Sequence, residues 1–266
     1  VMIELARTLA AAGAPPRTIV FIGFSAEESG LNGSKYYVAN PTPIALDGIR
    51  AVVNLDTVGR LGNGEVIALA TSTATEWQHV LRGITFTTGI ATKCIPGASQ
   101  SSDQQSFIDH GIPGVQLFTK ATLDYHRPTD TADKIDVDGL VKVASVAREM
   151  IDYLAQRPTP LTITIDAAAK PTGGADGSSR HVTFGLVPDY AAQGKGVTAE
   201  SVVPDSPAAR AGIVAGDILM ALDGVAVDGL GGFSNALKQH TPGDKVKATI
   251  LRDGIQRIVE VELLAR

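Results

Sequence analysis

The sequence is short of cysteine, of aromatic residues and of long apolar runs. Its 266 residues include one cysteine, Cys94, and only 5% aromatic residues. A single cysteine excludes an internal disulfide and a cysteine-rich zinc site, and Cys94 fits a small buried hydrophobic residue. No apolar run approaches the roughly 18 residues of a membrane span. The net charge is −5 without a Lys/Arg cluster, so we expect no nucleic-acid partner.

What remains is the composition of a globular protein of two domains. Hydrophobic residues make up 44% of the chain and charged residues 19%, enough for a sizeable core. The chain begins at Val1 in a stretch with helical spacing, 1–13, which Gly13 and two prolines end. We therefore expect a piece of a longer protein, in which an export signal would lie upstream.

Strand and helix patterns alternate over residues 1–157. Helical periodicity indicates three helices, and short apolar runs indicate four strands. The helices are expected at 1–13, 73–84 and 137–156, and the strands at 17–24, 49–56, 65–71 and 113–119. This alternation predicts an α/β domain with a mixed, largely parallel sheet sandwiched by helices. Residues 158–180 have a linker composition, and a small β-rich domain is expected at 181–266.

Three polar clusters follow predicted strands of the first domain. They are Glu27 with Glu28, then Asp56, and then His126. In open α/β sheets, ligands bind beyond the carboxyl ends of the strands. Two carboxylates and an imidazole are ligands that zinc prefers, and the remaining glutamate could act as a base toward water. Each residue also has a simpler interpretation, because paired glutamates can be solvated, Asp56 can cap a turn and His126 can lie on the surface.

The local sequence around these residues resembles that of the co-catalytic zinc aminopeptidase family, which includes bacterial leucine aminopeptidases. The matching stretches are "FSAEESGLNGSKYY", "NLDTVGR", "SSDQQSFIDHGIPGVQLFT" and "DYHRPTDTADKID", in the family's order. The resemblance implies a zinc exopeptidase fold and two zinc ions per complete catalytic domain. It also implies that Glu27 is the general base and that Glu28, Asp56 and His126 are metal ligands.

Two neighbours of His126 are candidates for supporting roles. Tyr125 could stabilise a developing oxyanion, or it could simply pack beside the site. Asp130 is a candidate acceptor for the second N–H of the imidazole, because ligating histidines usually donate that group to an oxygen.

The chain departs from the family pattern in two ways. The family's site has five ligands, two of which precede the glutamate pair, whereas residues 1–26 contain neither His nor Asp. We therefore expect fewer zinc ions, or none, and little or no activity from this chain alone. The second departure follows Asp103, where Gln104 stands in place of the histidine of many relatives. Both residues are assigned to the substrate side, and Gln104 cannot titrate near neutral pH.

Residues 181–266 resemble a PDZ domain of the permuted, bacterial HtrA-like kind. The run "SPAARAGIVAGDIL" carries the resemblance, and the Asp-Gly pair in "ALDGVAV" indicates a hairpin. A short helix is expected at 233–240. Such a domain would bind a C-terminal peptide as an added strand. The residues assigned to this groove are Thr183, Phe184, Gly185, Leu186, Phe233 and Leu237. Alternatively, Phe184, Leu186 and Leu237 fill the core and the groove is vestigial.

Together these features predict a zinc-dependent aminopeptidase with a PDZ module that binds a peptide or a partner. A carboxypeptidase or glutaminyl cyclase on the same fold is one alternative. A metal-free, peptidase-like scaffold that acts through its PDZ groove is the other, and the retention of Glu27, Glu28, Asp56 and His126 weighs against it. Because such exopeptidases are usually exported, a secreted or periplasmic location is expected.

Overall fold

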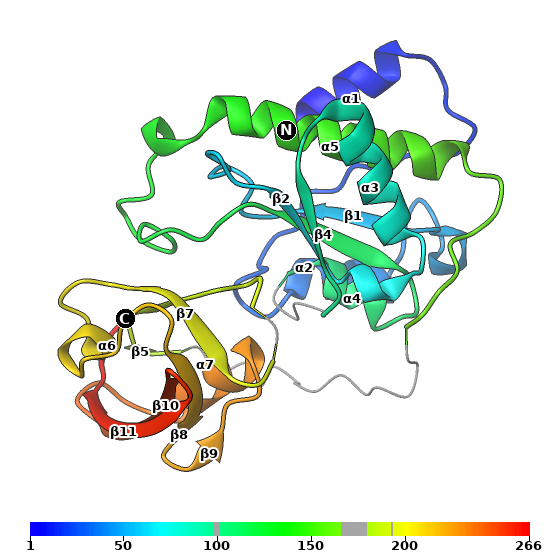
Figure 1. Ribbon diagram of the computed structural model, residues 1–266. Helices are drawn as coiled ribbons and strands as arrows, with labels where there is room; N and C mark the ends of the chain where they lie inside the picture. Colours follow the sequence, from blue (N-terminus) through cyan, green and yellow to red (C-terminus); the bar gives the residue numbers. More distant parts are fainter. Residues whose placement is uncertain (98–101, 166–179, 193) are drawn as a thin grey trace. The chain divides into compact units, whose positions relative to one another are not determined.

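The computed structural model describes residues 1–97, 102–165, 180–192 and 194–266, which form two compact units (Figure 1). The N-terminal unit comprises residues 1–120 and 131–172. The C-terminal unit comprises residues 173–266 and also the ten residues 121–130. Most of the predicted linker, residues 166–179, lies outside the described residues. Among the helices described, none is both long and apolar enough to cross a membrane.

The N-terminal unit is built on a four-stranded mixed sheet of order β1-β4-β2-β3. Its strands are β1 (Val52–Leu55), β2 (Val66–Leu69), β3 (Thr92–Ile95) and β4 (Gly114–Phe118). β1 runs parallel to β4 and β2 parallel to β3, whereas β2 and β4 are antiparallel. Two of the three pairings are therefore parallel, which confirms the predicted mixed, largely parallel sheet.

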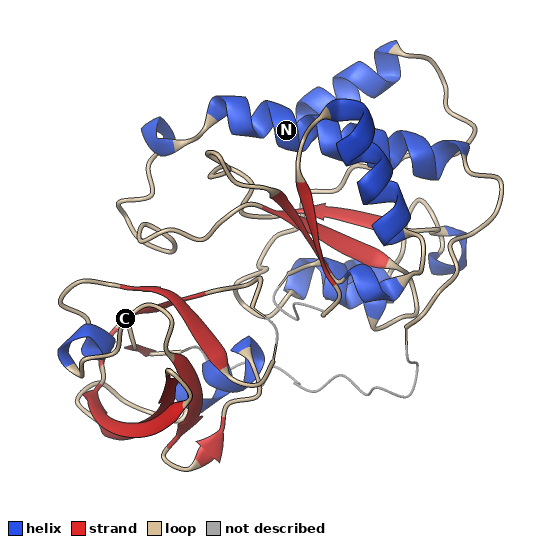
Figure 2. Cartoon of the chain, viewed as in Figure 1, coloured by secondary structure: helices blue, strands red, loops and turns tan. Residues whose placement is uncertain are grey.

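Helices cover both faces of this sheet (Figure 2). On one face lie α1 (Met2–Ala11), α3 (Trp77–Thr88) and α5 (Val137–Gln156), and on the other lie α2 (Asn32–Ala39) and α4 (Gln104–Ile108). Asp136 begins α5 by accepting a hydrogen bond from the Gly139 N–H, 2.9 Å away, a side-chain N-cap. The predicted sandwich is thus present, and it leaves the ends of the strands open to the loops that carry the candidate site.

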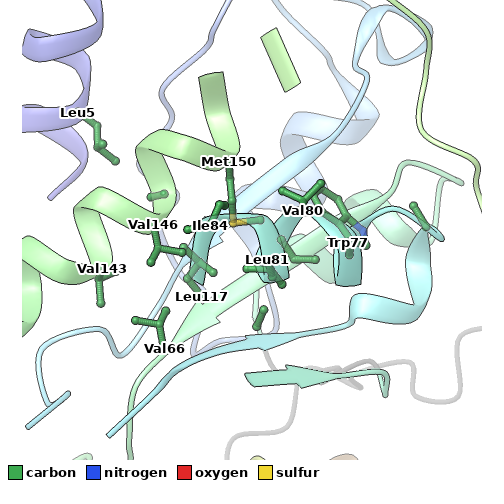
Figure 3. Close-up of a cluster of buried hydrophobic side chains, with 14 of the residues drawn as sticks. Leu5, Val66, Trp77, Val80, Leu81, Ile84, Leu117, Val143, Val146 and Met150 are labelled. Carbon is green, nitrogen blue, oxygen red and sulfur yellow. The ribbon is translucent and has the colours of Figure 1, made fainter. Parts of the chain in front are cut away.

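The main core lies between the sheet and the helices α1, α3 and α5 (Figure 3). Trp77 is fully buried at its centre, and its indole N–H donates to Thr73 Oγ1 at 2.9 Å. Buried apolar side chains of all three helices cluster with Val66 of β2 and Leu117 of β4. The helix residues labelled in Figure 3 beside Trp77 are Leu5, Val80, Leu81, Ile84, Val143, Val146 and Met150. The satisfied indole and the apolar surroundings make this the rigid support of the unit.

Most predicted elements form close to their predicted bounds, but one strand does not. The helices predicted at 1–13, 73–84 and 137–156 correspond to α1, α3 and α5, and three of the predicted strands to β1, β2 and β4. The prediction of a strand at 17–24 is wrong, because this apolar segment has no strand pairing and Val20 is 41% exposed. Apolar composition favours a strand, but a ladder also needs a hydrogen-bonding neighbour.

The first residues of the predicted linker belong to the N-terminal unit. Glu76 accepts hydrogen bonds from the Thr162 N–H and Oγ1, at 2.9 and 3.0 Å, and from Arg157 Nη2 at 2.7 Å. Ile163 forms a β-bridge with Ala74. The segment from 158 to 165 is therefore fixed on this unit rather than free as a linker.

The C-terminal unit is a small antiparallel β structure with two short helices. Its main sheet has the order β11-β10-β8-β7-β6, with β9 paired to β8, and β12 pairs with β5. The strands are β5 (Val182–Thr183), β6 (Leu186–Pro188), β7 (Val197–Val202), β8 (Ile218–Leu222), β9 (Val225–Ala226), β10 (Lys245–Arg252), β11 (Ile255–Glu262) and β12 (Leu264–Ala265). The helices are α6 (Pro207–Arg210) and α7 (Leu230–Lys238), so α7 starts three residues before the predicted helix.

Local sequence signals account for the turns of this unit. Asp223 and Gly224 both have positive φ, 46° and 79°, and they join β8 to β9 as the predicted hairpin. Ser206 begins α6 by accepting from the Ala209 N–H, and Pro207 occupies the first turn. Behind them, Asp217 is buried and forms a bidentate ion pair with Arg252, with both N–O distances 2.6 Å.

Candidate metal and peptide sites

The paired glutamates lie in a tight loop between the segment 17–24 and α2. Glu27 O accepts hydrogen bonds from the Gly30 and Leu31 N–H groups, at 2.9 and 2.8 Å, and Ser25 O accepts from the Gly33 N–H at 3.0 Å. A Cβ on Gly33 would lie 2.4 Å from Ser25 O. The loop can therefore close only with glycine at this position, which fixes the backbone that carries both carboxylates.

Asp56 follows β1 at the end of the sheet. Its Oδ1 accepts a hydrogen bond from Thr57 Oγ1 at 3.0 Å, and its Oδ2 accepts from Gln116 Nε2 at 3.4 Å. The Asp56 N–H donates to Leu117 O at 3.2 Å. Each carboxylate oxygen has two acceptor positions, so both oxygens of Asp56 keep one position available after these contacts.

Negative charge accumulates around Glu27. Burial, and then the charges of Glu28, Asp56 and Asp103, raise the pKa of Glu27 from its usual range to about 8. Burial and the Asp56 charge also raise the pKa of Asp103, against a hydrogen bond with Ser34 that lowers it. Carboxylates close enough to raise the pKa of Glu27 and Asp103 in this way form a site suited to a cation, which would remove the repulsion.

One buried oxygen in this group supports the same conclusion. Asp103 Oδ1 is inaccessible to water and, among the described residues, has no hydrogen-bond partner. An unpaired buried carboxylate oxygen is costly unless a donor or a cation is bound nearby. The oxygen donors present therefore fit zinc in their chemistry. However, no three His, Cys, Asp or Glu side chains of the described part of the chain are grouped closely enough to hold a metal ion between them.

The candidate residues around His126 belong to a different unit from the carboxylates. Tyr125, His126 and Asp130 lie in residues 121–130, which belong to the C-terminal unit, whereas the carboxylates belong to the N-terminal unit. The Tyr125 ring stacks on His126 with centroids 3.8 Å apart, and Tyr125 Oη accepts a hydrogen bond from Tyr190 Oη at 3.1 Å. The ligand role of His126 and the supporting role of Asp130 stay predictions.

Backbone strain occurs in every one of the three candidate segments. Ala26, Thr57 and His126 have positive φ angles of 55°, 52° and 58°, a region that costs free energy for residues other than glycine. Ala26 precedes Glu27, Thr57 follows Asp56, and His126 is itself a candidate ligand. Strained backbone concentrates at functional sites, so its position here favours a functional interpretation of all three segments.

The side chain of Gln104 is buried, and its assignment to the substrate side stays a prediction. Its side chain is 0% exposed, and it accepts from Asn54 Nδ2 at 2.8 Å and donates to Gln116 Oε1 at 3.2 Å. Because α4 begins here against the sheet, this side chain points into the unit. Asp103 is only partly buried, so its assignment to the substrate side stays a prediction.

Sequence patterns alone missed Asn54 and Gln116. Both residues interrupt apolar strands, "VVNL" and "GVQLF", and they are direct neighbours in the β1–β4 register. A polar side chain inside a strand that is otherwise buried was the available signal, because such a group requires a hydrogen-bond partner.

The predicted peptide groove has an open strand edge, but three of its assigned side chains are in the core. In the part of the chain described, β6 pairs with β7 alone, so its other edge could accept an added strand. Gly185 precedes β6 with φ 85°, and a Cβ there would lie 2.1 Å from Ser206 Cβ. Thr183, in β5, pairs with Leu264.

Phe184, Phe233 and Leu237 are 2%, 6% and 0% exposed, and the two phenyl rings meet edge to face with centroids 5.4 Å apart. Phe184 and Leu237 therefore lie in the core of this unit, and their role in a peptide groove stays a prediction. Leu186 is partly buried and lies on the open strand, so it is the assigned side chain best placed for a ligand.

The chain belongs to peptidase family M28. The family model matches residues 1–151, and a PDZ domain model matches residues 178–263. The chain is 28% identical over 167 residues to endoplasmic reticulum metallopeptidase 1 of Rattus norvegicus, an alignment of 58% of this chain and 18% of that protein. Over 58 residues it is 40% identical to a probable periplasmic serine endoprotease DegP-like of Halomonas elongata, covering 22% of this chain and 12% of that protein. The chain thus spans a small part of both relatives.

Solved structures show the same catalytic fold. An aminopeptidase from Aneurinibacillus sp. strain AM-1 is 26% identical and superposes with a TM-score of 0.52, covering 65% of this chain and 41% of that one. A zinc aminopeptidase from Bacillus subtilis superposes with a TM-score of 0.53 at 22% identity, covering 62% and 43%. The expected zinc aminopeptidase fold followed by a PDZ domain is therefore confirmed, and the chain is a peptidase-family protein with a metallopeptidase fold.

Proposed function

We propose that the protein is a zinc-dependent aminopeptidase whose PDZ domain binds a peptide. The observation that carries this proposal is the group of Glu27, Glu28, Asp56 and Asp103, in which the charges of the other three carboxylates act on the partly buried Glu27. The family and the similarity to aminopeptidases support the same reaction. Glu28, Asp56 and His126 would hold zinc, and bound zinc would polarise the scissile carbonyl and activate water.

Glu27 is the residue proposed to move the proton. Without a cation, burial and its neighbours raise its pKa to about 8, so most of it is protonated at neutral pH. A cation held by Glu28 and Asp56 would remove part of this repulsion and leave Glu27 free to accept a proton from water. Glu27 would then deliver that proton to the amine that leaves. Tyr125 is proposed to donate a hydrogen bond to the developing oxyanion.

Zinc occupancy and activity of this chain alone are proposed to be low. It offers three of the five ligands that the resemblance requires, and a site with fewer ligands binds the ion more weakly. Elemental analysis after dialysis should find well under two zinc ions per chain. Two tightly held ions would mean that residues other than those named complete the site.

The reaction is tested with matched peptides, with and without a blocked N-terminus, in the presence of added Zn²⁺. An aminopeptidase releases the first residue of the free peptide only, and Glu27→Gln should reduce this turnover by at least about 100-fold. Cleavage from the other end would indicate a carboxypeptidase, and cyclisation of N-terminal glutamine would indicate a glutaminyl cyclase. If no zinc binds at any concentration of added Zn²⁺, the scaffold alternative is favoured.

The PDZ domain is proposed to bind a C-terminal peptide along the open edge of β6. The ligand would add a strand next to Leu186, and its carboxylate would lie at the loop of Gly185. Fluorescence anisotropy with a labelled peptide that ends in an apolar residue, compared with its C-terminal amide, tests this directly. Equal binding of both peptides would contradict recognition of the carboxylate.

The names of the DegP-like relatives support a proposed periplasmic or secreted location.

A further inference from the structure

Below the candidate ligand Asp56, the N-terminal unit contains a row of carboxamide side chains from three different elements. Asn54 lies on β1, Gln116 lies beside it on β4, and Gln104 lies in the first turn of α4. Gln104 and Gln116 are 0% and 3% exposed. A buried amide needs partners for both its oxygen and its nitrogen, so three adjacent ones form a stable arrangement only when their polarities match.

The polarities do match, and they run in one direction. Asn54 Nδ2 donates to Gln104 Oε1 at 2.8 Å, Gln104 Nε2 donates to Gln116 Oε1 at 3.2 Å, and Gln116 Nε2 donates to Asp56 Oδ2 at 3.4 Å. The final bond is the longest and hence the weakest of the three. Every nitrogen in the row is directed toward Asp56, which therefore receives an N–H rather than a carbonyl oxygen.

The Asp56 end of the row fixes this direction, because an ionised carboxylate can only accept, and the far end is consistent with it. Asn54 Nδ2 also donates to Ser102 Oγ at 2.8 Å, so both of its hydrogens are used. Turning the Asn54 amide over would place its oxygen against Gln104 Oε1. On the other side of Asp56, Thr57 Oγ1 donates to Oδ1. The carboxylate is thus held by one donor on each oxygen.

The residues around Gln104 also reach the glutamate loop. Ser106, two residues after Gln104 in α4, shares a 2.8 Å hydrogen bond with Ser34 of α2, the helix that follows Glu27 and Glu28. Ser34 and Ser106 are both buried, at 0% and 2% exposure. The segment from 102 to 106 therefore hydrogen-bonds both to Asn54, which precedes Asp56, and to Ser34 of the helix that follows Glu27 and Glu28.

We propose that Asn54, Gln104 and Gln116 form a one-way amide relay that orients Asp56, so that its remaining acceptor positions face the cation site. The proposal rests on the proposed function only in taking Asp56 as a ligand. Gln104 and Gln116 are positioning residues, since neither would contact the metal or the substrate. Uncharged amides keep this polarity at every physiological pH, which a histidine at position 104 would not.

The first test needs no metal. In the full chain labelled with ¹⁵N, the side-chain amide protons of Gln116 should exchange slowly with D₂O. Gln104→Met removes the central acceptor and donor at similar size, and it should speed this exchange by roughly tenfold or more. The matched control is Gln105→Met, because Gln105 bonds instead to Asp109 on the surface. Equal protection of Gln116 in wild type and Gln104→Met would overturn the relay.

The second test measures Zn²⁺ affinity by competition with a chromogenic chelator. Gln104→Met should weaken binding by roughly 10- to 100-fold, the range found when partners of metal ligands are removed, and Gln105→Met should match wild type. If Asp56→Asn abolishes binding but Gln104→Met does not weaken it, the relay proposal fails and the proposed function stands. Zinc binding that is indifferent to Asp56→Asn would contradict both.

Gln104→Glu covers the case in which Gln104→Met does not fold, because it keeps the size and polarity of the side chain. The introduced carboxyl group can donate to Gln116 Oε1 only while protonated. When ionised, it should turn the Gln116 amide over and present a carbonyl oxygen to Asp56. The loss of zinc affinity relative to wild type at the same pH should therefore shrink as the pH falls from about 8 to about 6. A loss that does not change with pH would argue for a purely structural role.

Discussion

At the scale of single residues, Glu27 combines two features that oppose its ionisation. Its side chain is partly buried, and three other carboxylates, Glu28, Asp56 and Asp103, act on it. Burial is the larger cause, and the like charges add to it. A carboxyl group in these surroundings holds its proton near neutral pH unless a cation is bound. Glu27 is therefore expected to be protonated in the metal-free protein, and to act as the proposed base when zinc is bound.

The raised pKa predicts how the metal-free protein responds to pH. A carboxyl group whose pKa is raised by folding adds stability below its unfolded pKa of about 4.3, and this contribution is lost as the pH rises through about 8. The melting temperature of the N-terminal unit, measured with a chelator present, should therefore fall between about pH 5 and about pH 9. Glu27→Gln should flatten this dependence, whereas the exposed Glu65→Gln should leave it unchanged. A wild-type profile as flat as that of Glu27→Gln would contradict the prediction.

Asp217 shows the opposite behaviour in the C-terminal unit. Burial would raise its pKa, but the bidentate Arg252 and the Val214 N–H hold the pKa below its usual range. A lowered pKa contributes stability above the unfolded value, about 3.9, and that contribution is lost as the pH falls through the folded one. Asp217→Asn should destabilise this unit by about 3 kcal/mol at neutral pH, because it leaves Arg252 without its counter-charge. Urea unfolding of the C-terminal unit measures this, and a change below about 1 kcal/mol would show that the pair contributes little.

At the scale of elements, the loop of Glu27 and Glu28 depends on the first turn of α2. A Cβ at position 33 would lie 2.4 Å from Ser25 O and 2.8 Å from Ser25 N, both backbone atoms. Gly33→Ala should therefore destabilise the N-terminal unit by about 1–3 kcal/mol and weaken Zn²⁺ binding. The control is Gly83→Ala in α3, where a Cβ meets nothing within 4 Å and should stabilise the helix by up to about 1 kcal/mol. Thermal unfolding of both variants would decide, and a stabilised Gly33→Ala would refute the steric argument.

The sequence predicted elements well where periodicity alone determines them. The apolar spacing and the Asp136 cap specify α5 at 137–156, and the same bounds form in the structure. The segment 17–24 has an equally apolar sequence, but strand formation depends on a partner that no local pattern encodes. Asp56 follows the end of β1, as predicted, whereas Glu27 and Glu28 follow the segment 17–24, which forms no strand. The relay of Asn54, Gln104 and Gln116 to Asp56 could not be predicted from the sequence, because its bonds join residues 12 to 60 positions apart.

At the scale of the whole molecule, the covalent order of the chain and its grouping into units differ. Residues 121–130 follow β4 of the N-terminal unit in sequence, but they belong to the C-terminal unit together with residues 173–266. Within that unit, Tyr190 bonds to Tyr125, which stacks on His126. The segment that supplies the candidate histidine is thus supported by residues outside the span that matches the peptidase family, 1–151.

From the assignment of residues 121–130 to the C-terminal unit we predict how a shortened chain that ends at residue 165 behaves. Such a chain keeps the contacts of Glu76 with Thr162, so its N-terminal unit should fold with unchanged stability of the main core. It lacks Tyr190, however, and the segment 121–130 should lose the protection that the aromatic contacts give it. Hydrogen–deuterium exchange followed by mass spectrometry should show faster exchange in 121–130 than in the full chain, and equal exchange in α3 and α5. Tyr190→Phe in the full chain removes only the hydroxyl, and it should give an intermediate rate in the same peptides. If 121–130 is equally protected in all three proteins, that segment is stabilised without the C-terminal residues.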